Sequence, residues 1–239
     1  MCWSGEASYA VALTSFATVL YVAIKRESFL LWAPLLYAGL MELLQAYTYA
    51  YLGQCHLPQN QLATYLSYLH ISFQPFFMNM VALYFIPEKN QKKIAILAMS
   101  ICFVFIILSL IKIYPFSWAP PCQPGIDLFC GKTLCSLSGR WHIAWEIPYR
   151  DFFFYNWVYF LPAFLLPLLY GSWKFALYMF LTGPPIAWLT TQNPNEWPAV
   201  WCLYVVALIF VALFTPLRRM FIVRKWYSFN YPKCLGSMR

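Results

Sequence analysis

Long apolar runs separated by short polar connections extend along most of the chain. Seven runs are long enough for a helix that crosses a bilayer, which needs about 20 residues. They cover residues 7–24, 29–52, 62–86, 93–113, 152–170, 173–191 and 198–215. The runs are continuous rather than alternating between apolar and polar positions, so they predict helices and not the strands of a membrane barrel. The predicted fold class is all-α, a polytopic integral membrane bundle of about seven transmembrane helices.

The composition excludes an ordinary soluble domain. Hydrophobic residues make up 62% of the chain and charged residues only 10%, whereas about a quarter of a soluble domain is charged. The net charge of +8 does not indicate nucleic-acid binding, because the basic residues form short clusters between apolar runs, as membrane topology requires. We therefore expect membrane lipid as a partner, and no nucleic acid.

The basic residues also predict the orientation. With seven spans, 12 of the 16 Lys and Arg fall on one side of the membrane. The positive-inside rule then places the N-terminus outside and the C-terminus in the cytoplasm. The chain is predicted to be a single transmembrane domain over residues 1–239. Within it, residues 114–150 form an extracytoplasmic loop that carries cysteines, and residues 216–239 form a basic cytoplasmic tail.

The cysteines and the long outer loop give two further expectations. Five cysteines fall on the predicted outer side: Cys2, Cys55, Cys122, Cys130 and Cys135. An oxidising exterior favours one or two disulfides among them, with the pairing left open. Residues 138–147 are expected to form a short helix at the outer surface, ending before Pro148.

The run 62–86 is apolar enough to cross a bilayer, yet it carries His70, Gln74 and Asn79. His70 and Gln74 are four residues apart, so they share one face of a helix. Polar side chains at membrane depth usually face a protein interior or a cavity. We expect this segment to form the wall of a site in which Gln74 contacts a substrate, while Asn79 has a structural role.

Glu42 lies near the middle of the second run, three residues before Gln45 on the same helical face. A carboxylate at that depth needs a partner, a metal or a proton. Glu42 is therefore a candidate catalytic residue and Gln45 a candidate substrate contact, with His70 as the nearest expected partner. The alternative is a buried hydrogen bond that only fixes the packing of the helices.

His142 and Glu146 are four residues apart on the expected outer helix, a spacing that suits a metal site or an acid–base pair. If this segment folds over the second and third spans, His70 and His142 would bind a divalent metal, zinc or iron. Glu42 and Glu146 would then be the catalytic carboxylates. The alternative is an interfacial helix with a solvated polar face between tryptophan anchors.

The opening residues Met1-Cys2-Trp3-Ser4 resemble the start of an uncharacterised family of small polytopic membrane proteins. Further motifs fit the same pattern: Glu42-x-x-Gln45, Leu69-His70-Ile71-x-Phe73-Gln74-Pro75, Trp141-His142-Ile143-Ala144-Trp145 and Asn195-Glu196-Trp197-Pro198. The resemblance covers most of the chain. It implies a multi-pass membrane protein and no particular activity.

A seven-span layout is also similar to the membrane hydrolase superfamily that contains the alkaline ceramidases, which use a three-histidine zinc site with a His-x-x-x-His pair. The corresponding pair here is His142 and Glu146, so the chain departs from that pattern. Microbial rhodopsins resemble the chain in span count, but the predicted seventh span, 198–215, has no lysine to bind retinal.

Three functions fit these features. The first is a metal-dependent enzyme that acts on a lipid or small amphiphile in an outward-facing polar pocket, with a metal-bound water as the nucleophile. The second is a proton-coupled transporter of a small solute, in which Glu42 and His70 relay protons and Pro184-Pro185 breaks a helix. The third is a structural or sensor protein whose polar cluster only fixes the fold.

Overall fold

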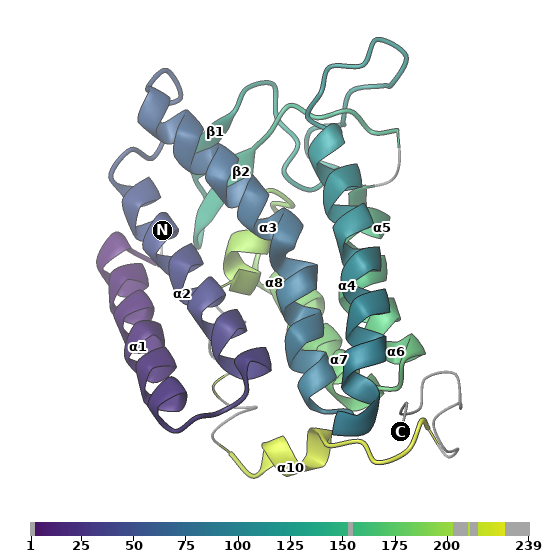
Figure 1. Ribbon diagram of the computed structural model, residues 1–239. Helices are drawn as coiled ribbons and strands as arrows, with labels where there is room; N and C mark the ends of the chain where they lie inside the picture. Colours follow the sequence, from purple (N-terminus) through teal and green to yellow (C-terminus); the bar gives the residue numbers. More distant parts are fainter. Residues whose placement is uncertain (1–2, 153–154, 203–209, 211–214, 228–239) are drawn as a thin grey trace.

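The computed structural model describes residues 3–152, 155–202, 210 and 215–227, and this part of the chain is mostly helical (Figure 1). Four long helices run side by side in the first half. They are α1 (Gly5–Ile24), α2 (Phe29–Tyr49), α3 (Pro58–Tyr84) and α4 (Glu88–Ile111). Short helices follow: α5 (Tyr155–Phe160), the π-helix η1 (Leu161–Leu165), α6 (Leu166–Leu169), α7 (Trp173–Thr182), α8 (Pro184–Thr190) and α10 (Leu217–Phe221).

Three helices of the described part, α1, α2 and α4, are long and apolar enough to cross a membrane. The third predicted span corresponds to α3, which has 27 residues but is not among these three. The predicted spans 152–170 and 173–191 are each divided into shorter helices. Most of the predicted span 198–215 lies outside the described residues.

Proline positions explain the divided helices. In η1 the Leu166 N–H donates to the Leu161 carbonyl, five residues back. Pro167 has no N–H, so it cannot donate in the same register to the Pro162 carbonyl. Asn79 of α3 supplies the missing donor, because its Nδ2 lies 2.7 Å from that carbonyl oxygen. Asn79 therefore has a structural role, as the sequence predicts.

The helix break expected near Pro184-Pro185 is present, since α7 ends and α8 begins on either side of Gly183. A Cβ on Gly183 would lie 2.6 Å from the Trp201 indole nitrogen and 2.7 Å from the Met179 carbonyl. Only glycine allows these segments to approach so closely.

Residues 138–147 do not form the predicted outer helix. They belong to an antiparallel hairpin of β1 (Cys135–Ser138) and β2 (Ile143–Glu146), so the all-α prediction is wrong here. The backbone finds long-range partners in place of helical ones: Trp145 N–H donates to the Asn195 carbonyl at 3.0 Å, and Ile147 N–H to the Phe129 carbonyl at 2.7 Å. The spacing of residues within the segment cannot predict hydrogen bonds to residues so distant in the sequence.

Two disulfides confirm the expectation that one or two such bonds form among the five cysteines Cys2, Cys55, Cys122, Cys130 and Cys135. Cys55 pairs with Cys135 and Cys122 pairs with Cys130, while Cys2 lies outside the described residues. The first bond joins the α2–α3 connection to β1 across a sequence separation of 80 residues, and the second closes a short loop within the segment 114–150.

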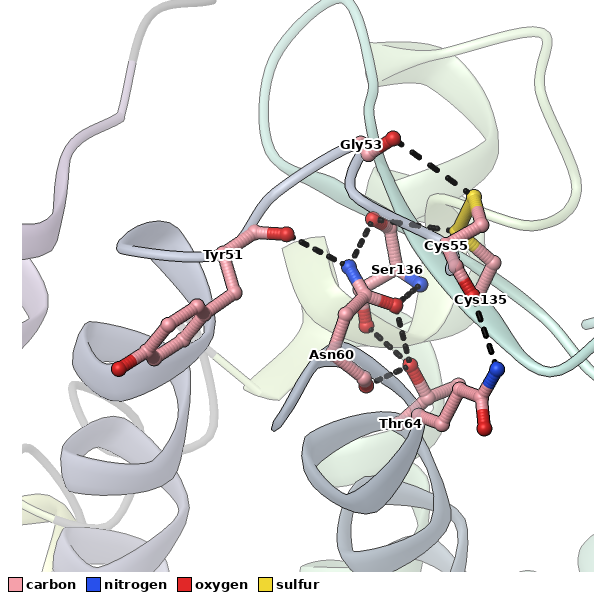
Figure 2. The surroundings of a disulfide bond; sticks show 8 residues. Tyr51, Gly53, Cys55, Asn60, Thr64, Cys135 and Ser136 are labelled. Carbon is pink, nitrogen blue, oxygen red and sulfur yellow. Dashed lines mark hydrogen bonds between the residues drawn. A yellow bond between two sulfur atoms is a disulfide. The ribbon is translucent and has the colours of Figure 1, made fainter. Parts of the chain in front are cut away.

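Asn60, in the first turn of α3, ties the same hairpin to the helices (Figure 2). Its Nδ2 donates to the carbonyls of Tyr51 at 2.8 Å and Ser136 at 2.9 Å, and its Oδ1 accepts from the Ser136 N–H at 2.9 Å. The side chain is fully buried. Beside the Cys55–Cys135 disulfide, these three bonds fix the position of β1 over the ends of α2 and α3.

We predict that Asn60→Ala lowers the melting temperature of the detergent-solubilised protein markedly. The change leaves the Ser136 N–H of β1 without its partner, which costs on the order of 2 kcal/mol in unfolding free energy. Gln59→Ala, at the exposed neighbouring position, is the matched control and should change the melting temperature little. Equal melting temperatures for both variants would contradict the anchoring role of Asn60.

Candidate functional site

A polar column runs along one face of α2. Glu42, Gln45 and Tyr49 occupy positions i, i+3 and i+7, so their side chains lie one above another. Glu42 and Gln45 are fully buried, and the Ser8 hydroxyl of α1 is close enough to interact with the Glu42 carboxyl. Within the described part of the chain, no side-chain oxygen or nitrogen of Glu42 or Gln45 has a hydrogen-bond partner of normal geometry. Such a carboxyl is costly when ionised and unpaired, which favours a bound proton or a ligand.

His142 lies at the end of this column that is nearest to the hairpin, next to Tyr49. The Tyr49 hydroxyl lies 3.0 Å from His142 Nδ1, and the Ile143 N–H donates to the same nitrogen at 2.8 Å. Nδ1 is therefore an acceptor, and the ring proton belongs on Nε2. Tyr49 must then donate to His142, which leaves the lone pairs of its hydroxyl available to a donor. His142 Nε2 is buried and has no hydrogen-bond partner among the described residues.

Glu196 fixes the loop that carries His142. Its carboxylate accepts from the backbone N–H groups of Trp141 and His142, the latter at 2.5 Å, and from the Thr191 hydroxyl at 2.7 Å. Gly139 makes room for this carboxyl, since a Cβ there would lie 2.6 Å from it. Sequence reasoning did not assign Glu196 a site role. The only signal was its place in the motif Asn195-Glu196-Trp197-Pro198.

A small cavity of about 20 Å³ lies between α2, α3 and α7. His70 lines it, with its ring stacked on Tyr37 at a centroid distance of 3.6 Å, and the Tyr37 hydroxyl donates to the His70 carbonyl. Gln74, Met41 and Cys202 also line the cavity. It is large enough for about one water molecule.

A second cavity, of about 40 Å³, lies toward the outer loop between Phe129, Trp197 and the middle of α3. Gln74 lines both cavities, and its Oε1 accepts a hydrogen bond from Tyr159 at 2.7 Å. The two cavities therefore follow one another along α3. The Gln74–Tyr159 hydrogen bond lies where they adjoin.

The structure brings some predicted site residues together and separates others. Glu42 and Gln45 are neighbours on α2, and His70 and Gln74 line one cavity. His70 contacts Tyr37 whereas His142 contacts Tyr49, and these tyrosines are separated by about 18 Å along α2 at 1.5 Å per residue. The two predicted metal ligands thus lie at different depths.

Glu146 does not share a helical face with His142. It lies in β2, where its side chain packs over Gly131. Among the described residues, no group of three or more His, Cys, Asp or Glu side chains is arranged to hold a metal ion. The donor set expected from the sequence therefore does not fit a zinc or iron centre in this arrangement.

The described chain is thus a mostly helical protein with three helices able to cross a membrane, a disulfide-bonded hairpin over one end and a buried polar column beneath that hairpin. It belongs to the Family of unknown function (DUF5765), which matches residues 6–222. No curated protein and no solved structure matches the chain.

The His142 contacts predict a pH-dependent stability. Burial lowers the pKa of His142 to about 3 from its ordinary value of 6.5. Below pH 6.5 the unfolded chain binds a proton that the folded chain does not, so the unfolding free energy falls as the pH drops toward 3. The slope is at most about 1.4 kcal/mol per pH unit.

The measurement is the melting temperature of the native chain and of His142→Gln across this range. The native chain should be the more stable at neutral pH, and its advantage should shrink on acidification. The comparison at each pH separates the contribution of His142 from that of the rest of the chain. His56→Gln, at an exposed position, should leave the pH dependence unchanged. A constant difference between native chain and His142→Gln would refute the burial of a neutral imidazole.

Proposed function

We propose that this protein is a multi-pass integral membrane protein that couples protonation of Glu42 to the movement of a small solute through the two cavities along α3. The proposal also includes about seven membrane spans. The N-terminus and the hairpin would lie outside the cytoplasm, and the basic tail inside it. Three candidate spans support it. So do the distribution of Lys and Arg and the two disulfides in segments expected outside the cytoplasm.

The observation that carries the proposal is the state of Glu42. The carboxyl is fully buried near the middle of α2, and neither oxygen has a hydrogen-bond partner of normal geometry among the described residues, the Ser8 hydroxyl being its polar neighbour. Acidic side chains at membrane depth typically mark proton or ion pathways. Because Glu42 lines neither of the two cavities along α3, a proton is the ligand that fits with the least rearrangement.

The cavities define the class of solute. Their walls are almost entirely apolar, with Gln74 and His70 as the main polar groups. Such walls suit a small neutral solute with one or two hydrogen-bonding groups. Cys202 lines the cavity of about 20 Å³ and interacts electrostatically with Glu42. Protonation of that carboxyl would therefore change the electric field at the wall of this cavity.

This arrangement gives His70 a different role from the predicted relay. On α2 the residues that line the cavity with His70 are Pro34, Tyr37, Ala38 and Met41, whereas Glu42 and Tyr49 are displaced around the helix. His70 is proposed as a solute contact rather than as the proton partner of Glu42. The metal-dependent enzyme ranks below the transporter, since its expected ligands lie at different depths.

We predict that Glu42 reacts with the hydrophobic carbodiimide dicyclohexylcarbodiimide at neutral pH. This reagent adds to protonated carboxyl groups in apolar surroundings and forms a stable N-acylurea. Peptide mass spectrometry should find the adduct on Glu42, absent in Glu42→Gln, and labelling should decline at alkaline pH. The exposed carboxyls of Glu6 and Glu88 are internal controls. Absence of the adduct at every pH would indicate an ionised, paired Glu42 and would remove the proton site.

The coupled transport is tested in proteoliposomes with an imposed pH gradient and a panel of small neutral solutes. A transported solute should accumulate with the native protein and fail to accumulate with Glu42→Gln, while Glu88→Gln behaves as the native chain. Gradient-driven uptake that is equal in Glu42→Gln would disprove the coupling. If Glu42 has a purely structural role, Glu42→Gln should instead have a lower melting temperature, and the native protein should transport no solute of the panel.

The proposed orientation predicts two different labelling patterns. Single cysteines replace Lys132 in the outer loop and Lys89 at the start of α4, both exposed positions, in a background without other free cysteines. A membrane-impermeant maleimide should label Lys132→Cys in intact cells and Lys89→Cys only after permeabilisation. Labelling of both positions from the same side would contradict the arrangement of spans.

A further inference from the structure

An aromatic groove lies at the outer end of α1 and α2, apart from the two cavities along α3. Its volume is about 900 Å³. Trp3, Tyr9, Tyr47 and Tyr49 line it, and Glu6 is the only charged side chain in its lining. These residues come from the segment before α1, from α1 and from α2, so folding is needed to bring them together.

The inner aromatic rings of the groove are held in place by the fold. The Trp3 indole N–H donates to the Ser8 hydroxyl at 2.7 Å, and the Trp3 ring stacks on His142 at a centroid distance of 6.0 Å. Tyr49 bonds to the same histidine. A Cβ on Gly5 would lie 3.1 Å from the Tyr49 Cβ, so the two helices are in close contact beneath the groove.

The walls of the groove remain open to a ligand. Tyr9 is 51% exposed and Tyr47 is 44% exposed. The polar ends of Trp3 and Tyr49 already have partners, and His142 covers one face of the Trp3 ring. What these two residues offer is therefore the ring surface that remains uncovered. The Glu6 carboxylate adds a negative charge at the rim.

Aromatic faces beside a carboxylate attract a cation. Apart from the Glu6 carboxylate and the hydroxyls of Tyr9 and Tyr47, the lining is mostly apolar. The groove therefore favours a weakly hydrated cation, because a compact and strongly hydrated ion would lose most of its water shell without replacement. We propose that this groove binds a quaternary ammonium group. Free choline-like solutes and the headgroups of phosphatidylcholine lipids share this chemistry. The proposal is independent of proton binding at Glu42.

The test uses isothermal titration calorimetry on the full-length protein in a non-ionic detergent. Choline is compared with its neutral carbon isostere dimethylbutanol, in which a carbon atom replaces the charged nitrogen. Choline should bind about tenfold more tightly than the isostere, the range of a desolvated cation–π contact. Glu6→Gln and Tyr47→Leu should each weaken choline binding about fivefold or more.

Tyr21→Leu, at an exposed position near the other end of α1, is the matched control and should bind choline as the native chain does. Melting temperatures of all variants are measured in parallel, so that loss of binding is separated from loss of folding. No choline binding, equal binding of the isostere, or binding unaffected by both groove variants would overturn the proposal. Each of those results would identify the aromatic side chains as interfacial anchors only.

Lipid nanodiscs distinguish the two sources of the ligand. If the groove takes a lipid headgroup, phosphatidylcholine nanodiscs should abolish choline binding that is present in phosphatidylglycerol nanodiscs. If the groove takes a free solute, choline should bind equally in both. Either result supports the quaternary ammonium site, and absence of choline binding in both lipids would count against it.

Discussion

The end of the structure that carries the hairpin depends on three hydrogen bonds that Asn60 makes with Tyr51 and Ser136 (Figure 2). A two-stranded hairpin is marginal alone, so this one needs external support. Asn60 and the Cys55–Cys135 disulfide supply it at β1. Once β1 is fixed, the loop that follows carries His142 to Tyr49, and Glu196 fastens that loop from the other side.

Buried polar groups fall into two classes in this protein. Asn60, Asn79 and Glu196 each form hydrogen bonds with backbone groups of another segment of the chain. Such groups replace water and stabilise the fold. Glu42 and Gln45 are equally buried but have no partners among the described residues. Other buried side chains of the described part, such as Ser15 and Trp201, also have polar atoms without a partner. Glu42 differs from them because its carboxyl can ionise, which makes burial without a partner more costly.

The sequence predicts the helices and most of the polar candidates, because both follow from local spacing. Glu42 and Gln45 share a face of α2, and His70 and Gln74 line one cavity, as the intervals of three and four residues require. The break at Gly183 also follows from the adjacent prolines. The number of complete spans is less predictable, since prolines divide the later apolar runs into short helices.

The hairpin is the part of the fold for which the local sequence pattern predicts the wrong secondary structure. The spacing of His142 and Glu146 is equally compatible with a helix and with a strand, and the choice depends on distant backbone partners near Phe129 and Asn195. The predicted metal site relied on the helical alternative. Because this segment is a hairpin and not a helix, His142 contacts Tyr49 at one end of α2. His70 instead contacts Tyr37, which lies about three turns away along the same helix.

The irregular helices have a consistent relation to the cavities. Pro184 lines the outer cavity immediately after the break at Gly183, and Tyr159, just before the π-helix, bonds to Gln74 where the cavities adjoin. π-Helical turns and broken helices leave fewer regular backbone bonds to disrupt, and they are frequent at functional sites. Regular helices α1 and α2 hold the buried carboxyl in place, while the segments opposite are those best able to rearrange. Proton-coupled transport, as proposed, would require this combination of a rigidly held carboxyl and cavity walls that can rearrange.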